Sequence, residues 1–235
     1  MTNIYKNPEK ISTKDLIGFL NDIEEKNAPG YFFISGNKEI VNFGPRVSII
    51  GTRNPSIEGI RNAITITTEL VKKEVVIVSG LAKGIDTEAH KAAIKANGKT
   101  IAVLGTPLDK YYPLQNKELQ DEIMKNHLAI SQFPMGSPIE RSNFPLRNRT
   151  MALISHASII IEASEKSGTC HQGWEALRLG RPLFIHEDLI KRNLTWPKKM
   201  VNYGAEIISN KNVQLVLDKL PVIKKGVVSI NALSF

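Results

Sequence analysis

Residues 47–53 have the sequence VSIIGTR, and residues 75–86 have the sequence VVIVSGLAKGID. Each begins with a short, nearly continuous run of apolar and β-branched residues, as expected for a strand whose sheet carries helices on both faces. Each run ends in a turn that contains glycine. Residues 57–73, between the two, have the apolar spacing of a helix. This strand–helix–strand order predicts a parallel α/β sheet.

The same alternation continues along the chain. Further strands are predicted at residues 100–104, 128–131, 157–161 and 182–185, and further helices at residues 86–96, 116–125, 173–179 and 213–220. Short loops between strands and helices are typical of doubly wound sheets. The predicted fold is therefore α/β: a doubly wound, mostly parallel sheet of an extended Rossmann-like kind, with a short N-terminal helical segment.

Residues 12–26 have an apolar stripe that predicts this N-terminal amphipathic helix, with Ser12 as its N-cap. Residues 31–37 predict a strand and a tight turn that lead into the main domain. Residues 191–199 predict a loop, because Pro197 interrupts them. We expect three parts: residues 1–40 form the helix and lead-in strand, residues 41–222 form the Rossmann-like domain, and residues 223–235 form a tail.

The chain is basic. Lys and Arg number 31 and Asp and Glu number 23, which gives a formal net charge of +8. An excess of this kind favours a polyanionic partner, such as nucleic acid, a phosphorylated ligand or an acidic membrane surface. A modest basic balance that only aids solubility is the alternative.

Cysteine usage and hydropathy indicate the compartment. The single cysteine, Cys170, excludes an internal disulfide and suits a reducing environment. No apolar stretch follows the charges of the N-terminus, so we expect no secretory signal. No apolar run approaches the ~20 residues that span a bilayer. We therefore expect a cytoplasmic protein without a membrane partner.

Four unusual segments fall at or near the ends of predicted strands, where open α/β sheets bind ligands. The first is Gly51-Thr52-Arg53, in which glycine lets the backbone approach a phosphate and arginine supplies a bidentate donor. The third and sixth positions of this turn are Arg53 and Ser56, whereas the dinucleotide fingerprint requires glycine at both. An NAD-type site is therefore disfavoured. An ordinary strand–helix turn is the alternative.

The second segment is residues 79–86. Gly80 and Gly84 flank Lys83, an arrangement that would present amides beside a mobile cation and could cradle a phosphate. Ser79 stands near the strand end where an NAD-binding domain usually carries an acidic residue for the ribose.

The third segment is residues 143–149, where Arg147, Asn148 and Arg149 follow an aromatic residue and a proline. Such a group suits phosphate contacts, with Asn and aromatic side chains meeting bases. A solvated helix start is the alternative. The fourth segment is Ser167-Gly168-Thr169, a turn before a predicted helix that could hold an anion or serve only as an N-cap.

No catalytic constellation is present in the sequence. The five histidines show no zinc-ligand spacing with the one cysteine, and His90 is expected to pack against the sheet. Asp86 is expected to cap the helix that follows it. Neither a GxSxG nor a GxxxxGK[ST] motif occurs. We expect a binding protein that is not an enzyme and uses no metal or cofactor.

These segments, in this order, resemble the DprA/Smf family of DNA-processing proteins. The resemblance rests on five ordered motifs and covers roughly residues 27–220. The motifs are residues 47–53, residues 78–86, residues 101–109 with Tyr112-Pro113, residues 143–149, and Glu162-Ala163 with residues 167–169.

The resemblance implies a homodimer that binds single-stranded DNA without strong sequence preference. It would shield incoming strands and help to load a RecA-type recombinase in natural transformation. By motif, Arg53 and Lys83 would be phosphate ligands. The pocket would be shaped by Gly51, Ser79, Gly80 and Gly84, the basic surface extended by Arg147, Asn148 and Arg149, and amides and hydroxyls supplied by Ser167, Gly168 and Thr169.

The chain departs from the family pattern in two ways. Many members carry a fuller N-terminal helical domain and a C-terminal winged helix, and from the sequence we expect neither in full. Residues 170–174, with the sequence CHQGW, replace a more usual small and aliphatic run.

Two other functions compete with this interpretation. The turn at residues 167–169 also resembles that of the LOG-type phosphoribohydrolases, in which a glutamate closely follows the threonine. Here Gln172 takes that place and Glu175 lies further along. General acid–base chemistry needs a carboxylate within hydrogen-bond reach. The second alternative is a sensor domain that binds a small nucleotide.

Overall fold

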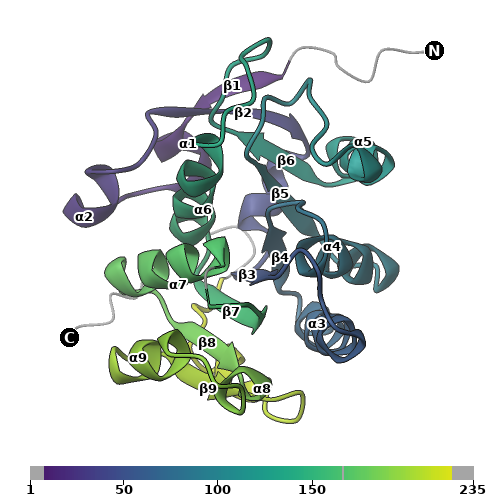
Figure 1. The fold of residues 1–235 in the computed structure, drawn as a ribbon. Coiled ribbons are helices and arrows are strands. Elements are labelled where there is room, and N and C mark those ends of the chain that lie inside the picture. The colour runs from purple at the N-terminus through teal and green to yellow at the C-terminus, as the bar shows by residue number, and fades with distance from the viewer. Residues whose placement is uncertain (1–7, 166, 224–235) are drawn as a thin grey trace.

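The computed structural model describes residues 8–165 and 167–223, and its strands form a nine-stranded sheet in the order β1-β2-β6-β5-β4-β3-β7-β8-β9 (Figure 1). The strands are β1 (Glu9–Ser12), β2 (Tyr31–Gly36), β3 (Arg46–Gly51), β4 (Val76–Ser79), β5 (Thr100–Leu104), β6 (Leu128–Ser131), β7 (Ala157–Glu162), β8 (Leu183–His186) and β9 (Glu206–Ile208). The seven strands from β3 to β9 pair in parallel, and β1 and β2 add antiparallel strands at one edge.

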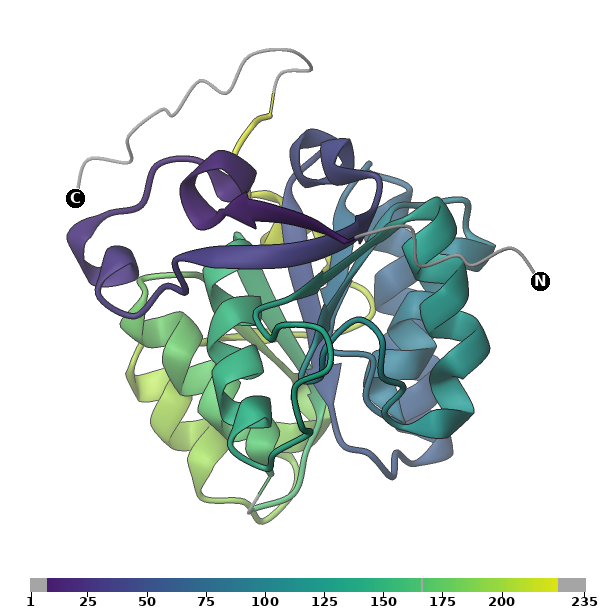
Figure 2. The same cartoon turned by 90° about the horizontal axis from the view of Figure 1, so that it is seen from above.

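Helices cover both faces of this sheet. They are α1 (Thr13–Ile17), α2 (Asp22–Glu25), α3 (Ile57–Val71), α4 (Ile85–Lys95), α5 (Lys117–Asn126), α6 (Asn143–Ile154), α7 (Gly168–Arg178), α8 (Glu187–Ile190), α9 (Trp196–Asn202) and α10 (Gln214–Leu217). Figure 2 shows α3, α4 and α5 on one side and α6, α7 and α9 on the other. The doubly wound, mostly parallel Rossmann-like fold is therefore confirmed.

The order of the strands creates a switch point. The chain proceeds from β3 outward through β4 and β5 to β6, and then returns to place β7 on the other side of β3. Ligands of open α/β sheets bind beyond the carboxyl ends of the strands at such a point. The turns that follow β3, β4, β5 and β7 therefore meet at one edge.

The core explains why the strand runs are nearly continuously apolar. Ile49 belongs to the apolar cluster that contains Ile66 of α3, whereas its neighbour Ile50 belongs to a separate cluster that contains Met151 of α6. All four side chains are at most 2% exposed. Successive residues of a strand point to opposite faces, so both must be apolar when both faces are covered.

The N-terminal segment differs from the prediction. Ser12 is an N-cap, and its hydroxyl accepts a hydrogen bond from the N–H of Asp15 at 3.0 Å. The predicted helix at residues 12–26 is nevertheless wrong, because α1 ends before Gly18, whose φ is +86°, and α2 follows as a separate turn. The lead-in strand is confirmed as β2, which pairs with both β1 and β6.

Three α-helices, α6, α8 and α9, lie where none was predicted. Helix α6 occupies the third motif, and α9 occupies part of the predicted loop at residues 191–199. Pro197 lies in the first turn of α9, where its missing N–H costs nothing, so it begins this helix instead of interrupting it. The predicted tail lies outside the described residues, apart from Ile223. Among the described helices, none has the length and hydropathy to cross a bilayer.

His90 packs against the sheet as predicted. It is fully buried, and its Nδ1 lies 2.7 Å from the Thr100 hydroxyl. Burial lowers the pKa of His90 to about 3. The unfolded chain, with a histidine pKa of about 6.5, therefore binds a proton that the folded chain does not.

We therefore expect stability to fall as the pH drops below about 6.5. His90 alone should remove about 1 kcal/mol of unfolding free energy between pH 7 and pH 5.5. Urea unfolding of the wild type, of His90→Gln and of the exposed-site control His171→Gln measures this. A pH dependence that is the same in His90→Gln and the wild type would contradict the assignment.

Candidate nucleic-acid interface

A pocket of about 400 Å³ lies at the carboxyl edge of the sheet. Its wall comes from the turns after β3, β4 and β5 and from the start of α6. The lining residues are Arg53, Gly80, Ala82, Lys83, Gly105, Tyr111, Tyr112, Pro113, Leu114, Phe144 and Arg147. The structure therefore brings together four of the residues predicted from the sequence: Arg53, Gly80, Lys83 and Arg147.

Two of these residues present free positive charge. Arg53 and Lys83 are exposed, and within residues 8–165 and 167–223 neither forms an ion pair with a carboxylate. The Cζ atom of Arg53 lies 5.7 Å from the centroid of the Phe144 ring, at cation–π distance. The pocket thus combines mobile cations with an aromatic surface.

Arg147 has a different environment. It is 5% exposed, and its Nη1 donates to the carbonyls of Gly80 and, at 3.2 Å, Val103. A Cβ at position 80 would overlap the guanidinium, so glycine is needed there. Burial lowers the pKa of Arg147, and the nearby Asp86 opposes this shift. Arg147 is therefore a buried part of the pocket wall that ties α6 to the ends of β4 and β5.

The turn after β4 is stabilised by hydrogen bonds to the buried carboxylate of Asp86. Asp86 is buried, and its Oδ2 accepts hydrogen bonds from the N–H groups of Gly80 at 3.2 Å and Ala82 at 3.4 Å. These two amides are therefore already satisfied, whereas the Lys83 side chain is exposed and lines the pocket. The predicted capping role of Asp86 is wrong, because the N-cap of α4 is Gly84 and it has no side-chain hydrogen bond.

Gly84 joins this turn to the turn after β3. Its φ is +88°, and a Cβ there would overlap the backbone of Thr52 and Arg53. The close approach lets Ile85 N–H donate to the Thr52 carbonyl at 3.2 Å. Ser79 is fully buried and donates to the carbonyl of Ile49 at 2.7 Å, so it supports the strands and does not face the pocket.

The turn at Ser167-Gly168-Thr169 begins α7 and lies next to the pocket wall without lining it. Ser167 is the N-cap and accepts from Thr169 N–H at 3.2 Å. The Thr169 hydroxyl donates to the Gly51 carbonyl at 3.2 Å. Asn148 donates to the Gly168 carbonyl at 3.2 Å and accepts from Arg147 Nε at 2.9 Å. These bonds connect α6, α7 and β3.

Arg149 is not brought into the pocket. It lies two residues after Arg147, on a different face of the same helix. It is exposed and borders a small recess between α6 and α7, together with Glu24, Glu175 and Arg178.

Other residues of the pocket were not predicted as site residues from the sequence, among them Tyr111, Tyr112 and Leu114. The Tyr112 and Phe144 rings lie 5.2 Å apart between centroids, and Leu114 is 71% exposed. The feature of the sequence that could have identified these three residues is their position after the predicted strand at residues 100–104. Ligand-binding turns follow strand ends in this fold class, so this turn should have been considered with the others.

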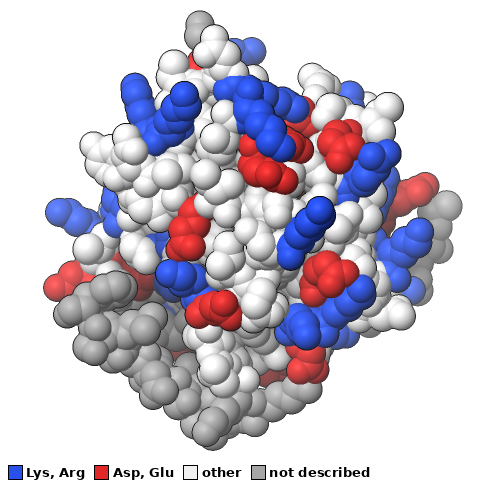
Figure 3. Space-filling model, turned by 90° about the horizontal axis from the view of Figure 1, so that it is seen from below, with Lys and Arg blue, Asp and Glu red and all other residues white. Residues whose placement is uncertain are grey.

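Basic and acidic side chains are mixed on one face of the molecule. Figure 3 shows a face on which Lys and Arg side chains are interspersed with Asp and Glu. The attraction of an anion to the pocket therefore depends on the local position of Arg53 and Lys83, not on the net charge of the chain.

The fold and the site together define a Rossmann-like α/β protein with a cationic and aromatic pocket at the carboxyl edge of its sheet. The chain belongs to the family described as DNA recombination-mediator protein A, whose model matches residues 11–220. The resemblance to DprA/Smf proteins found in the sequence is confirmed.

Among curated relatives, the chain is 42% identical over 185 residues to DNA processing protein DprA of Streptococcus pneumoniae, covering 78% of this chain and 65% of that one. It is 40% identical over 184 residues to Protein Smf of Synechocystis, covering 77% and 46%. It is 35% identical over 199 residues to DprA of Bacillus subtilis, covering 84% and 66%. The chain thus spans about half to two thirds of the length of these relatives.

Solved structures of DprA proteins also resemble this chain. The X-ray structure of DprA from Streptococcus pneumoniae matches with a TM-score of 0.80 and 34% identity, over 93% of this chain and 76% of that one. DprA from Helicobacter pylori, described for its single-stranded DNA binding mode, matches with a TM-score of 0.76 and 28% identity, over 86% and 95%. A molybdenum cofactor binding protein from Rippkaea orientalis has a TM-score of 0.53 at 16% identity, which shows the shared fold alone.

Proposed function

We propose that this protein binds single-stranded DNA in the pocket, with Arg53 and Lys83 contacting phosphates and Phe144 and Tyr112 contacting bases. The observation that carries the proposal is the meeting of two unpaired cations and two aromatic rings in one pocket of about 400 Å³. Sequence-tolerant binding of single strands combines these two kinds of contact. The related Helicobacter pylori protein, described for this binding mode, supports the proposal.

The position of the rings favours an unpaired strand. Phe144 is only partly exposed and lies between Arg53 and Tyr112. A base can reach such a ring only when it is released from stacking and pairing, as in a single strand. Titration of oligo-dT against a duplex of the same length tests this directly. Equal affinity for the two at the same salt would contradict the proposal.

Tyr112 gives a specific prediction. It is 45% exposed beside the pocket, so its ring is available to a base. We expect Tyr112→Ala to weaken oligo-dT binding by about 1–3 kcal/mol, the usual loss of one base–aromatic contact. Fluorescence anisotropy measures the change.

The matched control is Tyr203→Ala. Tyr203 is also exposed, at 73%, and it also packs against another ring, that of Trp174, at 5.3 Å between centroids. This substitution should leave oligo-dT binding unchanged. Equal losses in both variants would assign the effect to a general change in the fold.

The role in the cell is proposed from the family. The chain would protect incoming single strands and assist the loading of a RecA-type recombinase, acting as a cytoplasmic homodimer. Support comes from its membership of the DNA recombination-mediator family. Recombinase filament formation on oligo-dT, with and without the protein, tests the loading step, and sedimentation tests the dimer.

We also propose that the protein catalyses no nucleotide hydrolysis. Gln172, at the place of the hydrolase glutamate, is buried and donates to Ser48 at 3.0 Å. Glu175 pairs with Arg178. Neither residue lines the pocket. Release of free base from a nucleoside monophosphate would contradict this proposal. Calorimetry with a cyclic dinucleotide would show whether the pocket instead serves a nucleotide sensor.

A further inference from the structure

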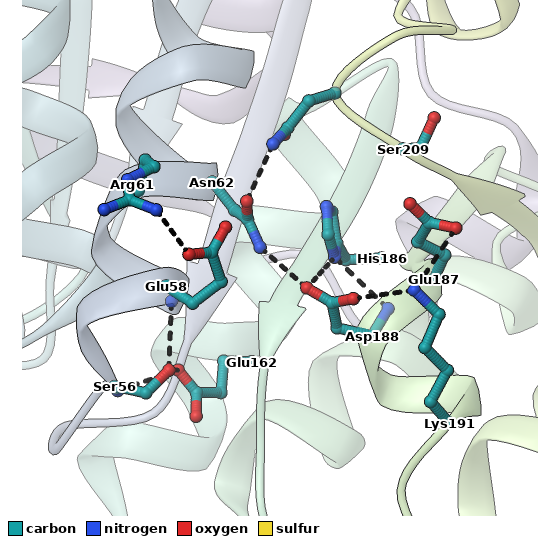
Figure 4. Close-up of polar contacts among 12 residues, drawn as sticks. Ser56, Glu58, Arg61, Asn62, Glu162, His186, Glu187, Asp188, Lys191 and Ser209 are labelled. Atoms are coloured by element: carbon teal, nitrogen blue, oxygen red, sulfur yellow. Dashed lines mark hydrogen bonds and ion pairs between the residues drawn. The ribbon is translucent and has the colours of Figure 1, made fainter.

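Glu162 holds both ends of the turn that carries Arg53. It lies at the carboxyl end of β7, and its backbone carbonyl accepts a hydrogen bond from Thr52 N–H at 2.6 Å. Its Oε2 accepts from the N–H and from the hydroxyl of Ser56, each at 3.0 Å. Figure 4 shows the carboxylate beside Ser56. A single residue of β7 therefore fixes the β3–α3 turn.

The carboxylate lies against the first turn of α3. This helix has 15 residues, and Ser56 is its N-cap. A Cβ at Gly59 would overlap Oε2, which shows how closely the carboxylate approaches the helix. The first N–H groups of a helix attract anions, and Rossmann-like proteins bind dinucleotide phosphates at the helix that follows the first strand of the parallel sheet. In this chain that place is occupied by the protein's own anion.

A cation completes the arrangement. Arg192, from the loop between α8 and α9, donates through Nη2 to Oε1 of Glu162 at 2.8 Å. The Glu162 side chain is 8% exposed and that of Arg192 is 43% exposed. An anion that replaced the carboxylate would find the same helix terminus, the same Ser56 donors and this guanidinium.

We propose that Glu162 is a specificity-determining residue: its carboxylate fills the anion site at the start of α3 and so excludes the phosphates of dinucleotides from the switch point. Anions are then left with the neighbouring pocket of Arg53 and Lys83. The inference concerns the β3–α3 turn and does not depend on what the pocket binds.

The test uses the full chain in the background Arg53→Ala/Lys83→Ala, so that the pocket cannot bind the probe. Glu162→Ala is compared with Glu58→Ala by calorimetry with pyrophosphate. Glu58 is the matched control, because it lies in the first turn of the same helix but points to Arg61 at 2.7 Å (Figure 4). The Glu162 variant should bind pyrophosphate about tenfold more tightly than the control, as expected for one charge-assisted contact. Adding Arg192→Ala should reduce that gain.

Equal pyrophosphate binding by the two variants would overturn the proposal. If Glu162→Ala unfolds, refolding is monitored with increasing pyrophosphate, which should restore the melting transition of this variant and leave that of Glu58→Ala unchanged. Absence of rescue would also overturn the proposal. Because oligo-dT is not used, failure here leaves the proposed DNA binding standing, and failure of DNA binding leaves this result intact.

Discussion

Replacing both exposed cations of the pocket, Arg53→Ala and Lys83→Ala, is expected to weaken oligo-dT binding by about 100-fold or more. Each side chain is exposed at the pocket, and no described carboxylate pairs with either. Loss of a hydrogen bond to a charged group costs about 1.5–3 kcal/mol, and two such losses give this factor. Each lost phosphate contact should also reduce the slope of log K against log salt by about 0.7, because fewer counterions are released.

The measurement is anisotropy of labelled oligo-dT at two or more salt concentrations. The control is the double variant Arg149→Ala/Lys95→Ala, which removes the same charge from the chain. Arg149 lies at the α6–α7 recess, and Lys95 ends α4 at the opposite edge of the sheet. The affinity of this control variant for oligo-dT should fall much less than that of the pocket variant. If the control variant loses as much affinity for oligo-dT as the pocket variant, the strand runs across the recess. The assignment of DNA binding to the pocket is then wrong.

Arg147→Ala is expected to have the largest effect on stability, about 3 kcal/mol. It removes the bonds to Gly80, Val103 and Asn148 together and leaves two carbonyls without their donor in the interior. It also removes the positive charge that favours ionised Asp86, whose pKa burial raises. Urea unfolding measures the change.

Arg149→Ala on the same helix is the control for stability and should change it by less than about 0.5 kcal/mol, since this side chain is exposed. Arg147→Lys keeps the charge but loses the planar fork, so it should recover only part of the loss. An Arg147→Ala variant as stable as the wild type would show that the buried guanidinium is not a structural tie.

Sequence reasoning succeeded where periodicity decided the structure. The apolar runs at residues 100–104 and 128–131 are β5 and β6 with the predicted bounds. It failed for α6, which is buried on several sides and carries Arg147 inside the protein, so the helix has no single apolar face. A helix without a single apolar face gives no 3.6-residue periodicity in its sequence.

The candidate site was predicted only in part, because the sequence indicates where strands end but not which groups a long side chain contacts. Turns after strands could be located, and Arg53 and Lys83 indeed meet at one pocket. The partner of a long side chain depends on tertiary structure, however. Only the folded turn after β4 shows that Arg147 donates to the Gly80 carbonyl. The fold also shows that Asp86 accepts from the Gly80 and Ala82 amides, which are therefore not free for a phosphate.

The most direct test of the proposed binding mode is a crystal structure of the protein with oligo-dT. We expect phosphates within hydrogen-bond distance of Arg53 and Lys83, and a base in contact with the ring of Phe144 or Tyr112. A strand bound along the α6–α7 recess beside Arg149, with the pocket empty, would contradict it.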